Sequence, residues 1–192
     1  MLQLILASTS VYRKSLLEKL QLNFSCQAPD MDETPVPGES ARELVIRLAR
    51  AKAEAVGRNH PGALIIGSDQ VALLNDTLIG KPHDHQRATA QLRASSGQTL
   101  SFYTGLCLHN SATGSSEVIC EPFSVHFRTL SDAQIERYLI REQPYQCAGS
   151  FKAEGLGISL FEKLEGDDPN TLVGLPLIRL IALLQRQGVE VP

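Results

Sequence analysis

Hydrophobic and polar residues follow two different periods along this chain, and each period predicts one kind of element. Short apolar or alternating runs predict strands at residues 3–7, 24–28, 63–74, 100–109, 117–127 and 156–164. Apolar residues at helical spacing predict helices that begin near residues 11, 40, 84, 131 and 176. Strands and helices alternate irregularly, with hairpin-like neighbours in the middle of the chain. This order predicts an α/β fold with a mixed sheet flanked by helices, rather than a purely parallel sheet.

Polar residues mark the starts of several helices. Ser40 and Glu43 form a capping box for a helix that reaches about residue 58, and Ser131 with Gln134 caps another that reaches about residue 141. The polar turn at residues 8–10 can cap the first helix in the same way.

One lysine interrupts the apolar stripe of the helix that begins at residue 40. Lys52 lies four residues after Leu48 and four before Val56, inside that stripe. Its side chain can extend along its methylenes into solvent, or it can point its ammonium at a buried anion. Both interpretations stay open at this point.

A carboxylate interrupts the predicted central strand in a similar way. Asp69 stands between Ser68 and Gln70 in an otherwise apolar run. A buried carboxylate needs a metal, a cation or hydrogen-bond donors, so a functional site is favoured over a purely structural aspartate. Strict alternation sends Asp69 and Gln70 to opposite faces, so we expect the strand to end or bulge there if both serve one site.

Length and composition limit the class of protein. The chain has 192 residues, of which 43% are hydrophobic and 20% charged, and its net charge is −3. We expect one domain over residues 1–192, with two lobes and a ligand cleft between them. The charge does not favour nucleic acid as a partner, and no apolar run approaches the roughly 18 residues of a membrane span. Because the first residues also lack the pattern of a signal peptide, we expect a cytoplasmic protein.

Several familiar motifs are absent. The four cysteines are widely spaced, which favours free thiols over disulfides or a zinc site, and His83 and His85 read as a loop pair rather than metal ligands. Gly80-Lys81-Pro82 lacks the upstream glycine and the following Ser/Thr of a Walker A loop. Neither a complete dinucleotide fingerprint nor a G-x-S-x-G motif occurs.

The polar residues that remain suit a phosphate ester. Hydroxyls at a helix N-terminus, together with basic side chains and carboxylates, are typical of a site for a triphosphate with a divalent cation. The candidate anion-binding residues are Ser8, Ser10, Arg13, Lys14, Lys52 and Lys81, and the candidate carboxylates are Glu33 and Asp69.

Seven short motifs follow one another along the chain: Ala7-Ser8-Thr9-Ser10-x-x-Arg13, Asp32-Glu33, Ala49-Arg50-x-Lys52-Ala53, Gly67-Ser68-Asp69-Gln70, Gly80-Lys81-Pro82, Ala148-Gly149-Ser150-Phe151 and Val173-Gly174-Leu175-Pro176. In this order the chain resembles the Maf family of nucleoside triphosphate pyrophosphatases from about residue 4 to residue 184. The resemblance implies an elongated mixed α/β fold with a cleft, similar to the inosine triphosphate pyrophosphatases. It also implies hydrolysis of a nucleotide substrate to monophosphate and diphosphate with a divalent cation, either Mg²⁺, Mn²⁺ or Co²⁺.

The resemblance also implies roles for individual residues. Asp69 matches the family's proton acceptor, which activates the attacking water. Glu33 is a candidate metal ligand, with or without Asp69, and the sequence leaves the division of these two roles open. The phosphate-binding positions implied by the family are Ser8, Ser10, Arg13, Lys52 and Lys81.

Three departures from the commonest family pattern bear on the base that is recognised. Tyr12 stands where an arginine is usual, Gln70 where a threonine is usual, and Glu154 where a glutamine is usual. Together they resemble the branch of the family that hydrolyses 7-methyl-GTP. An aromatic face attracts the cationic methylated guanine, and a carboxylate accepts guanine's N1–H and amino group. Taken singly, a surface tyrosine and a solvated glutamate are the simpler interpretations.

Two other functions stay open. The chain could hydrolyse a broader range of nucleoside triphosphates, or it could be a nucleotide-binding regulator of cell division. Asp69, Glu33, Lys52 and Lys81 together argue against a pure binder, which needs no base. The apolar last helix suits either the core or the interface of a homodimer.

Overall fold

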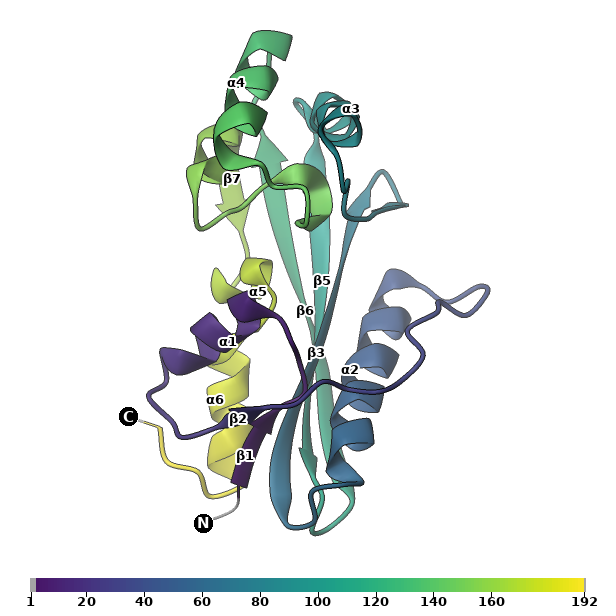
Figure 1. The fold of residues 1–192 in the computed structure, drawn as a ribbon, viewed down its shortest axis with the longest axis vertical. Coiled ribbons are helices and arrows are strands. Elements are labelled where there is room, and N and C mark those ends of the chain that lie inside the picture. Colours follow the sequence, from purple (N-terminus) through teal and green to yellow (C-terminus); the bar gives the residue numbers. More distant parts are fainter. Residues whose placement is uncertain (1–2, 192) are drawn as a thin grey trace. The chain divides into compact units, whose positions relative to one another are not determined.

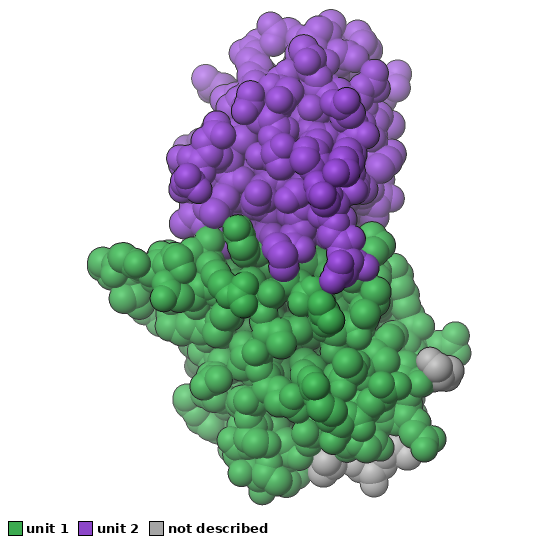
Figure 2. Space-filling view, turned by 180° about the vertical axis from the view of Figure 1, so that it is seen from behind, with its two compact units in different colours: residues 1–70, 103–121, 168–192 green, residues 71–102, 122–167 purple. Residues whose placement is uncertain are grey.

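The computed structural model describes residues 3–191. The chain divides into two compact units, which Figure 2 shows in different colours. Unit 1 contains residues 1–70, 103–121 and 168–192, and unit 2 contains residues 71–102 and 122–167. Among residues 3–191, no helix is both long and apolar enough to cross a membrane.

The strands form one sheet with the order β2-β1-β3-β5-β6-β7, and β4 pairs with β3. The strands are β1 (Gln3–Leu6), β2 (Ser25–Cys26), β3 (Ala63–Leu74), β4 (Thr77–Ile79), β5 (Thr99–Asn110), β6 (Ser115–Phe127) and β7 (Phe161–Glu165), labelled in Figure 1 where there is room. β1 pairs in parallel with β2 and β3, whereas β4 and β7 pair antiparallel with β3 and β6. The predicted mixed α/β fold is therefore confirmed.

Within residues 3–191, five of the six α-helices begin within one residue of a predicted position, whereas the short helix at Asn170–Val173 was not predicted. They are α1 (Val11–Glu18), α2 (Ala41–Gly57), α3 (His85–Ser95), α4 (Asp132–Glu142), α5 (Asn170–Val173) and α6 (Leu177–Arg186). Both predicted capping boxes are present, at Ser40 with Glu43 and at Ser131 with Gln134. Ser10 caps α1 by accepting a hydrogen bond from the Arg13 amide.

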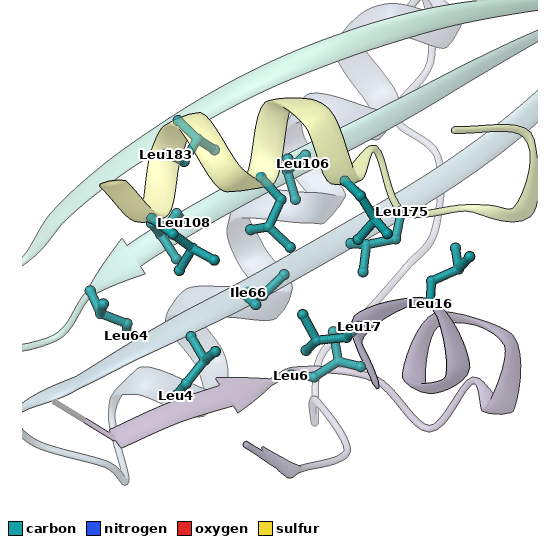
Figure 3. Close-up of a cluster of buried hydrophobic side chains, with 13 residues drawn as sticks. Leu4, Leu6, Leu16, Leu17, Leu64, Ile66, Leu106, Leu108, Leu175 and Leu183 are labelled. Atoms are coloured by element: carbon teal, nitrogen blue, oxygen red, sulfur yellow. The ribbon is translucent and has the colours of Figure 1, made fainter. Parts of the chain in front are cut away.

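The core of unit 1 fills both faces of the sheet. Along β1 and β3, alternate side chains belong to two separate clusters of buried residues, as the two-residue period of a strand requires. Ile5 and Ile65 pack with small residues of α2. The other face packs against α1 and α6, as the close-up in Figure 3 shows. Its labelled residues are Leu4, Leu6, Leu16, Leu17, Leu64, Ile66, Leu106, Leu108, Leu175 and Leu183.

Two glycines allow α2 to lie against the sheet backbone. A Cβ at Gly67 would lie 2.1 Å from the Ala49 carbonyl oxygen, and one at Gly105 would lie 2.1 Å from that of Val45. Only residues without a side chain fit at these two positions. This contact sets the depth at which side chains of α2 meet those of β3.

One predicted strand in unit 2 is partly wrong. Residues 156–164 were expected to be extended, but Leu156–Leu160 form a 3₁₀ helix and β7 begins at Phe161. The Leu156 amide donates to the Glu142 carboxylate, and the Gly157 amide donates to the Lys152 carbonyl. These bonds hold the chain in a turn that a sheet ladder would have to break.

Unit 2 has an aromatic core. Phe151 packs edge to face against Phe102, Phe127 and Phe161, and Phe127 packs in the same way against Phe161. The ring centroids in these pairs lie 4.8–5.7 Å apart. The ring nitrogens of His85 contact the Tyr145 hydroxyl and the Glu136 carboxylate within this unit. All four cysteines lie within residues 3–191, and none of them forms a disulfide.

We expect Gly67→Ala to lower the free energy of unfolding by about 1–3 kcal/mol, because an added methyl group would force α2 away from the sheet. Gly80→Ala is the matched control, since nothing lies within 4 Å of a Cβ there. Urea denaturation followed by circular dichroism would measure both. Equal stability of the two variants would contradict the close approach of α2.

Candidate functional site

Two carboxylates of unit 1 meet at the Lys52 ammonium. Lys52 Nζ lies 2.7 Å from Asp69 Oδ1 and 2.9 Å from Glu33 Oε2. The side chains of Lys52 and Asp69 are only 7% and 11% exposed, whereas that of Glu33 is 54% exposed. Of the two interpretations of Lys52, the structure therefore has the lysine directed at a buried anion.

Local structure explains how these three side chains meet. Asp69 lies on the face of β3 that packs against α2, and Lys52 lies on the buried stripe of α2. Glu33 comes from the loop between β2 and α2. There, Asp32 accepts hydrogen bonds from the amide and hydroxyl of Thr34, and the Thr34 carbonyl accepts one from Arg47. The loop is thus tied to α2 next to Glu33.

Arg13 shares the electrostatic environment of this cluster. Its Nε donates to the Gly174 carbonyl at 2.9 Å. Burial lowers the pKa of Arg13 from its ordinary value, while the charges of Asp69 and Glu33 act in the opposite direction. A guanidinium stays protonated at neutral pH in this situation. The cluster therefore combines two cations with two carboxylates.

The two predicted serines lie in the turn before α1. The hydroxyl oxygen of Ser8 accepts a hydrogen bond from the Ser10 amide at 3.1 Å, and Ser10 in turn caps the helix that carries Arg13. Ser8 is buried and Ser10 half-buried. In the structure these hydroxyls shape the turn, and a helix N-terminus of this kind favours anions. The exposed Lys14 points elsewhere, toward Glu18.

Gln70 faces away from Asp69. β3 continues through these residues to Leu74, and the alternation expected for a strand places Asp69 and Gln70 on opposite faces. The Gln70 Nε2 donates to Thr104 Oγ1 at 2.9 Å and to the carbonyls of Thr171 and Leu172 at 2.8 and 3.2 Å. Gln70 is thus bonded to β5 and α5, on the opposite face of the strand.

Ser68, on the same face as Gln70, connects β3 to the residue that holds Arg13. Its fully buried hydroxyl lies 2.9 Å from the carbonyl oxygens of both Gly105 and Gly174. The Gly174 carbonyl therefore receives a donor from Ser68 as well as from Arg13. Sequence reasoning missed this connection and the part played by Thr104. The available signals were a threonine inside a buried strand and the glycine of the last motif.

The remaining predicted site residues are distributed between the two units. Tyr12 is half-buried in α1 of unit 1. Lys81 and Glu154 belong to unit 2, where both are exposed: Lys81 precedes α3, and Glu154 lies in the loop between Phe151 and the 3₁₀ helix at Leu156–Leu160.

The carboxylate pair fits one kind of metal site. Within residues 3–191, no group of three or more His, Cys, Asp or Glu side chains is placed to hold an ion. Asp69 and Glu33 already share one cation, the Lys52 ammonium. Mg²⁺ is commonly bound by one or two carboxylates together with substrate phosphates, so two converging carboxylates are sufficient for such an ion.

Fold and site together define a mixed α/β protein with a buried carboxylate and ammonium pair next to its sheet. The chain belongs to the Maf family: the family model described as Maf-like protein matches residues 3–187. The resemblance in the sequence motifs is thereby confirmed.

Similar curated proteins cover the whole chain. A 7-methyl-GTP pyrophosphatase of Vibrio vulnificus (strain CMCP6) is 59% identical over 98% of this chain and 97% of its own length. Proteins of the same name from Nitrosococcus oceani and Pseudomonas fluorescens (strain Pf0-1) are 59% and 58% identical, over 98% and 100% of this chain and 94% and 100% of their own lengths. The solved structure of the Staphylococcus aureus Ham1 protein aligns with 66% of this chain and 72% of its own, with 14% identity and a TM-score of 0.42. That likeness is too distant to carry an argument.

We expect Lys52→Met to lower the free energy of unfolding by about 3 kcal/mol at neutral pH, because the buried Asp69 carboxylate would lose its ionic partner. Glu33→Gln is the matched comparison and should cost less than about 1 kcal/mol, since Glu33 is half exposed. Thermal and urea denaturation would measure both. A loss of the same size for the two variants would contradict the unequal burial of the two carboxylates.

Proposed function

We propose that this chain is a nucleoside triphosphate pyrophosphatase that hydrolyses 7-methyl-GTP to 7-methyl-GMP and diphosphate. The observation that carries the chemistry is the buried Asp69 carboxylate beside the Lys52 ammonium, with Arg13 in the same field. The substrate is suggested by the names of full-length relatives at 57–59% identity. Removal of modified nucleotides from the cellular pool is the role that this reaction would serve.

Asp69 is the proposed general base. It takes a proton from a water molecule whose oxygen forms a bond to the α-phosphorus, and the bond from this phosphorus to the bridging oxygen of the diphosphate breaks. The Lys52 ammonium, 2.7 Å from Asp69 Oδ1, holds this carboxylate in place, and the charge of Arg13 lies in the same field. Arg13, Lys52 and Lys81, with the turn of Ser8 and Ser10, would bind the phosphates and stabilise the charge of the departing diphosphate.

Glu33 is the proposed principal ligand of a divalent cation. Its side chain is half exposed and can exchange the Lys52 ammonium for an ion, whereas Asp69 is buried against the same lysine. This difference favours Glu33 as ligand and Asp69 as base. When bound, Mg²⁺, Mn²⁺ or Co²⁺ would neutralise phosphate charge, and carboxylate oxygens suit all three ions.

Three side chains are proposed to select the base. Tyr12 offers an aromatic face to the cationic 7-methylguanine, and the exposed Glu154 can accept both of guanine's edge donors. The Gln70 amide nitrogen is engaged with α5, so its contribution to selectivity would pass through the position of that helix. A uracil or thymine ring would set its carbonyls against the Glu154 carboxylate.

Assembly and location stay predictions. The leucines of α6 are buried in the core of unit 1, so the apolar character of this helix no longer argues for a dimer. A homodimer and a cytoplasmic location are compatible with a small nucleotide as the substrate.

We expect pyrophosphate release from 7-methyl-GTP to exceed that from GTP, dTTP, UTP and CTP, with Mg²⁺ or Mn²⁺ present.

Asp69→Asn should reduce the rate of pyrophosphate release from 7-methyl-GTP by about 10²–10⁴, because the general base is lost, while the variant stays folded. Asp76→Asn, an exposed aspartate in the β3–β4 turn, is the control and should keep full activity. An active Asp69→Asn would remove Asp69 as the base, and no release from any substrate by the wild type would favour a binding role.

We expect the combined change Tyr12→Arg, Gln70→Thr and Glu154→Gln to shift preference from 7-methyl-GTP toward UTP and dTTP. The three substitutions remove the aromatic face and the carboxylate that favour a methylated guanine. The ratio of kcat/KM values for 7-methyl-GTP and UTP measures it. A substrate profile identical to that of the wild type would contradict the assignment of these residues, while activity itself would still support the proposed reaction.

A further inference from the structure

The loop that carries Glu154 is anchored at two points to the C-terminal half of α4, within unit 2. The Lys152 amide donates to the Tyr138 hydroxyl at 3.1 Å. The Leu156 amide donates to Glu142 Oε2 at 2.8 Å. Glu154 lies midway between the two anchored residues, two positions from each. Its backbone is therefore held from both sides, although its own side chain is exposed.

The charge of the Glu142 carboxylate is neutralised by the ammonium of Lys152. Lys152 Nζ lies 3.2 Å from Glu142 Oε1 and donates to the Glu142 carbonyl at 3.1 Å. The side chains of Glu142 and Lys152 are 17% and 27% exposed, so both partners of this ion pair are largely shielded from solvent. A Cβ at Gly155 would lie 2.9 Å from Glu142 Oε2, which shows how closely the carboxylate fills the loop.

The loop also closes on itself. The Lys152 carbonyl accepts hydrogen bonds from the amides of Gly155 and Gly157, at 3.2 and 3.1 Å. Phe151, the residue before Lys152, is buried in the aromatic core of unit 2. Burial raises the pKa of Tyr138 above its ordinary value, and the charges of Glu142 and Glu154 act in the same direction. The Tyr138 hydroxyl therefore stays neutral at physiological pH.

We propose that Glu142 is a positioning residue for base recognition: with Lys152 and Tyr138 it fixes the loop so that Glu154 presents its carboxylate to the guanine edge. This inference rests on the proposed function. The Glu142 carboxylate is bound to Lys152 and to the Leu156 amide. Glu154 is therefore the exposed carboxylate in this loop that a ligand can contact. Preorganisation of this kind increases affinity by reducing the ordering that binding requires.

Titration with the products 7-methyl-GMP and UMP tests the inference without depending on catalysis. We expect Glu142→Ala to lower the preference for 7-methyl-GMP over UMP by about tenfold, a coupling of the size found between residues in contact. For 7-methyl-GTP hydrolysis, the same variant should raise KM more than it lowers kcat. Glu142→Gln keeps an oxygen that accepts from the Leu156 amide and should restore most of the preference. Tyr138→Phe removes the other anchor and should act in the same direction as Glu142→Ala.

A double-mutant cycle with Glu154→Gln separates positioning from a general structural effect. If Glu142 acts through Glu154, adding Glu142→Ala to Glu154→Gln should change the preference little. Asp132→Asn, which removes an exposed ion pair with Arg93 at the start of the same helix, is the control and should leave the preference unchanged. Losses that add in the double variant would overturn the inference, as would full preference in Glu142→Ala.

The proposed function fails in a different way. A wild-type chain that binds the two nucleotides equally would overturn base recognition and this inference together. A selective wild type with an equally selective Glu142→Ala would overturn the inference alone. If Glu142→Ala does not fold, as judged by circular dichroism, the cycle is carried out with Tyr138→Phe, for which the same outcomes apply.

Discussion

The ion pair between Lys52 and Asp69 is the interaction on which the site depends. Burying two charges is unfavourable unless they meet at short distance, and here the nitrogen and oxygen lie 2.7 Å apart. That distance requires the backbone of α2 to lie against the sheet. Gly67 and Gly105 make this approach feasible, because a side chain at either position would overlap a carbonyl of the helix. The packing of two glycines therefore determines where the proposed base is held.

The face of β3 opposite Asp69 is hydrogen-bonded to neighbouring elements of unit 1. A strand sends successive side chains to opposite faces, so the residues on either side of Asp69 point away from it. Ser68 and Gln70 use that position to bind carbonyls of β5, α5 and Gly174. Because the Gly174 carbonyl also receives Arg13, the strand holds the carboxylate on one face and orients a cation from the other. Both faces of one short polar segment thus contribute to one cluster of charges.

Sequence patterns predicted what depends on local structure. The periods and capping residues located β3 at Ala63–Leu74 and both capping boxes, since these follow from neighbours along the chain. They missed β4, although Asn75 and Asp76, with φ of 47° and 62°, form the kind of turn that joins two strands. The partner of Lys52, the bonds of Gln70 and the turn after Glu154 were beyond local patterns. Each depends on groups at least 14 residues away in the sequence.

Each unit contains a lysine paired with a largely buried carboxylate, and a second carboxylate that is more exposed. In unit 1, Lys52 is paired with the buried Asp69 and the half-exposed Glu33. In unit 2, Lys152 neutralises the largely buried Glu142 and leaves the exposed Glu154 for a ligand. A carboxylate held by a buried cation has one stable position, whereas a solvated one can exchange partners at little cost. In unit 1 this difference supports the proposal of Asp69 as a fixed general base and Glu33 as an exchangeable metal ligand. In unit 2 it supports the proposal that Glu142 fixes the loop while Glu154 is free to contact the guanine.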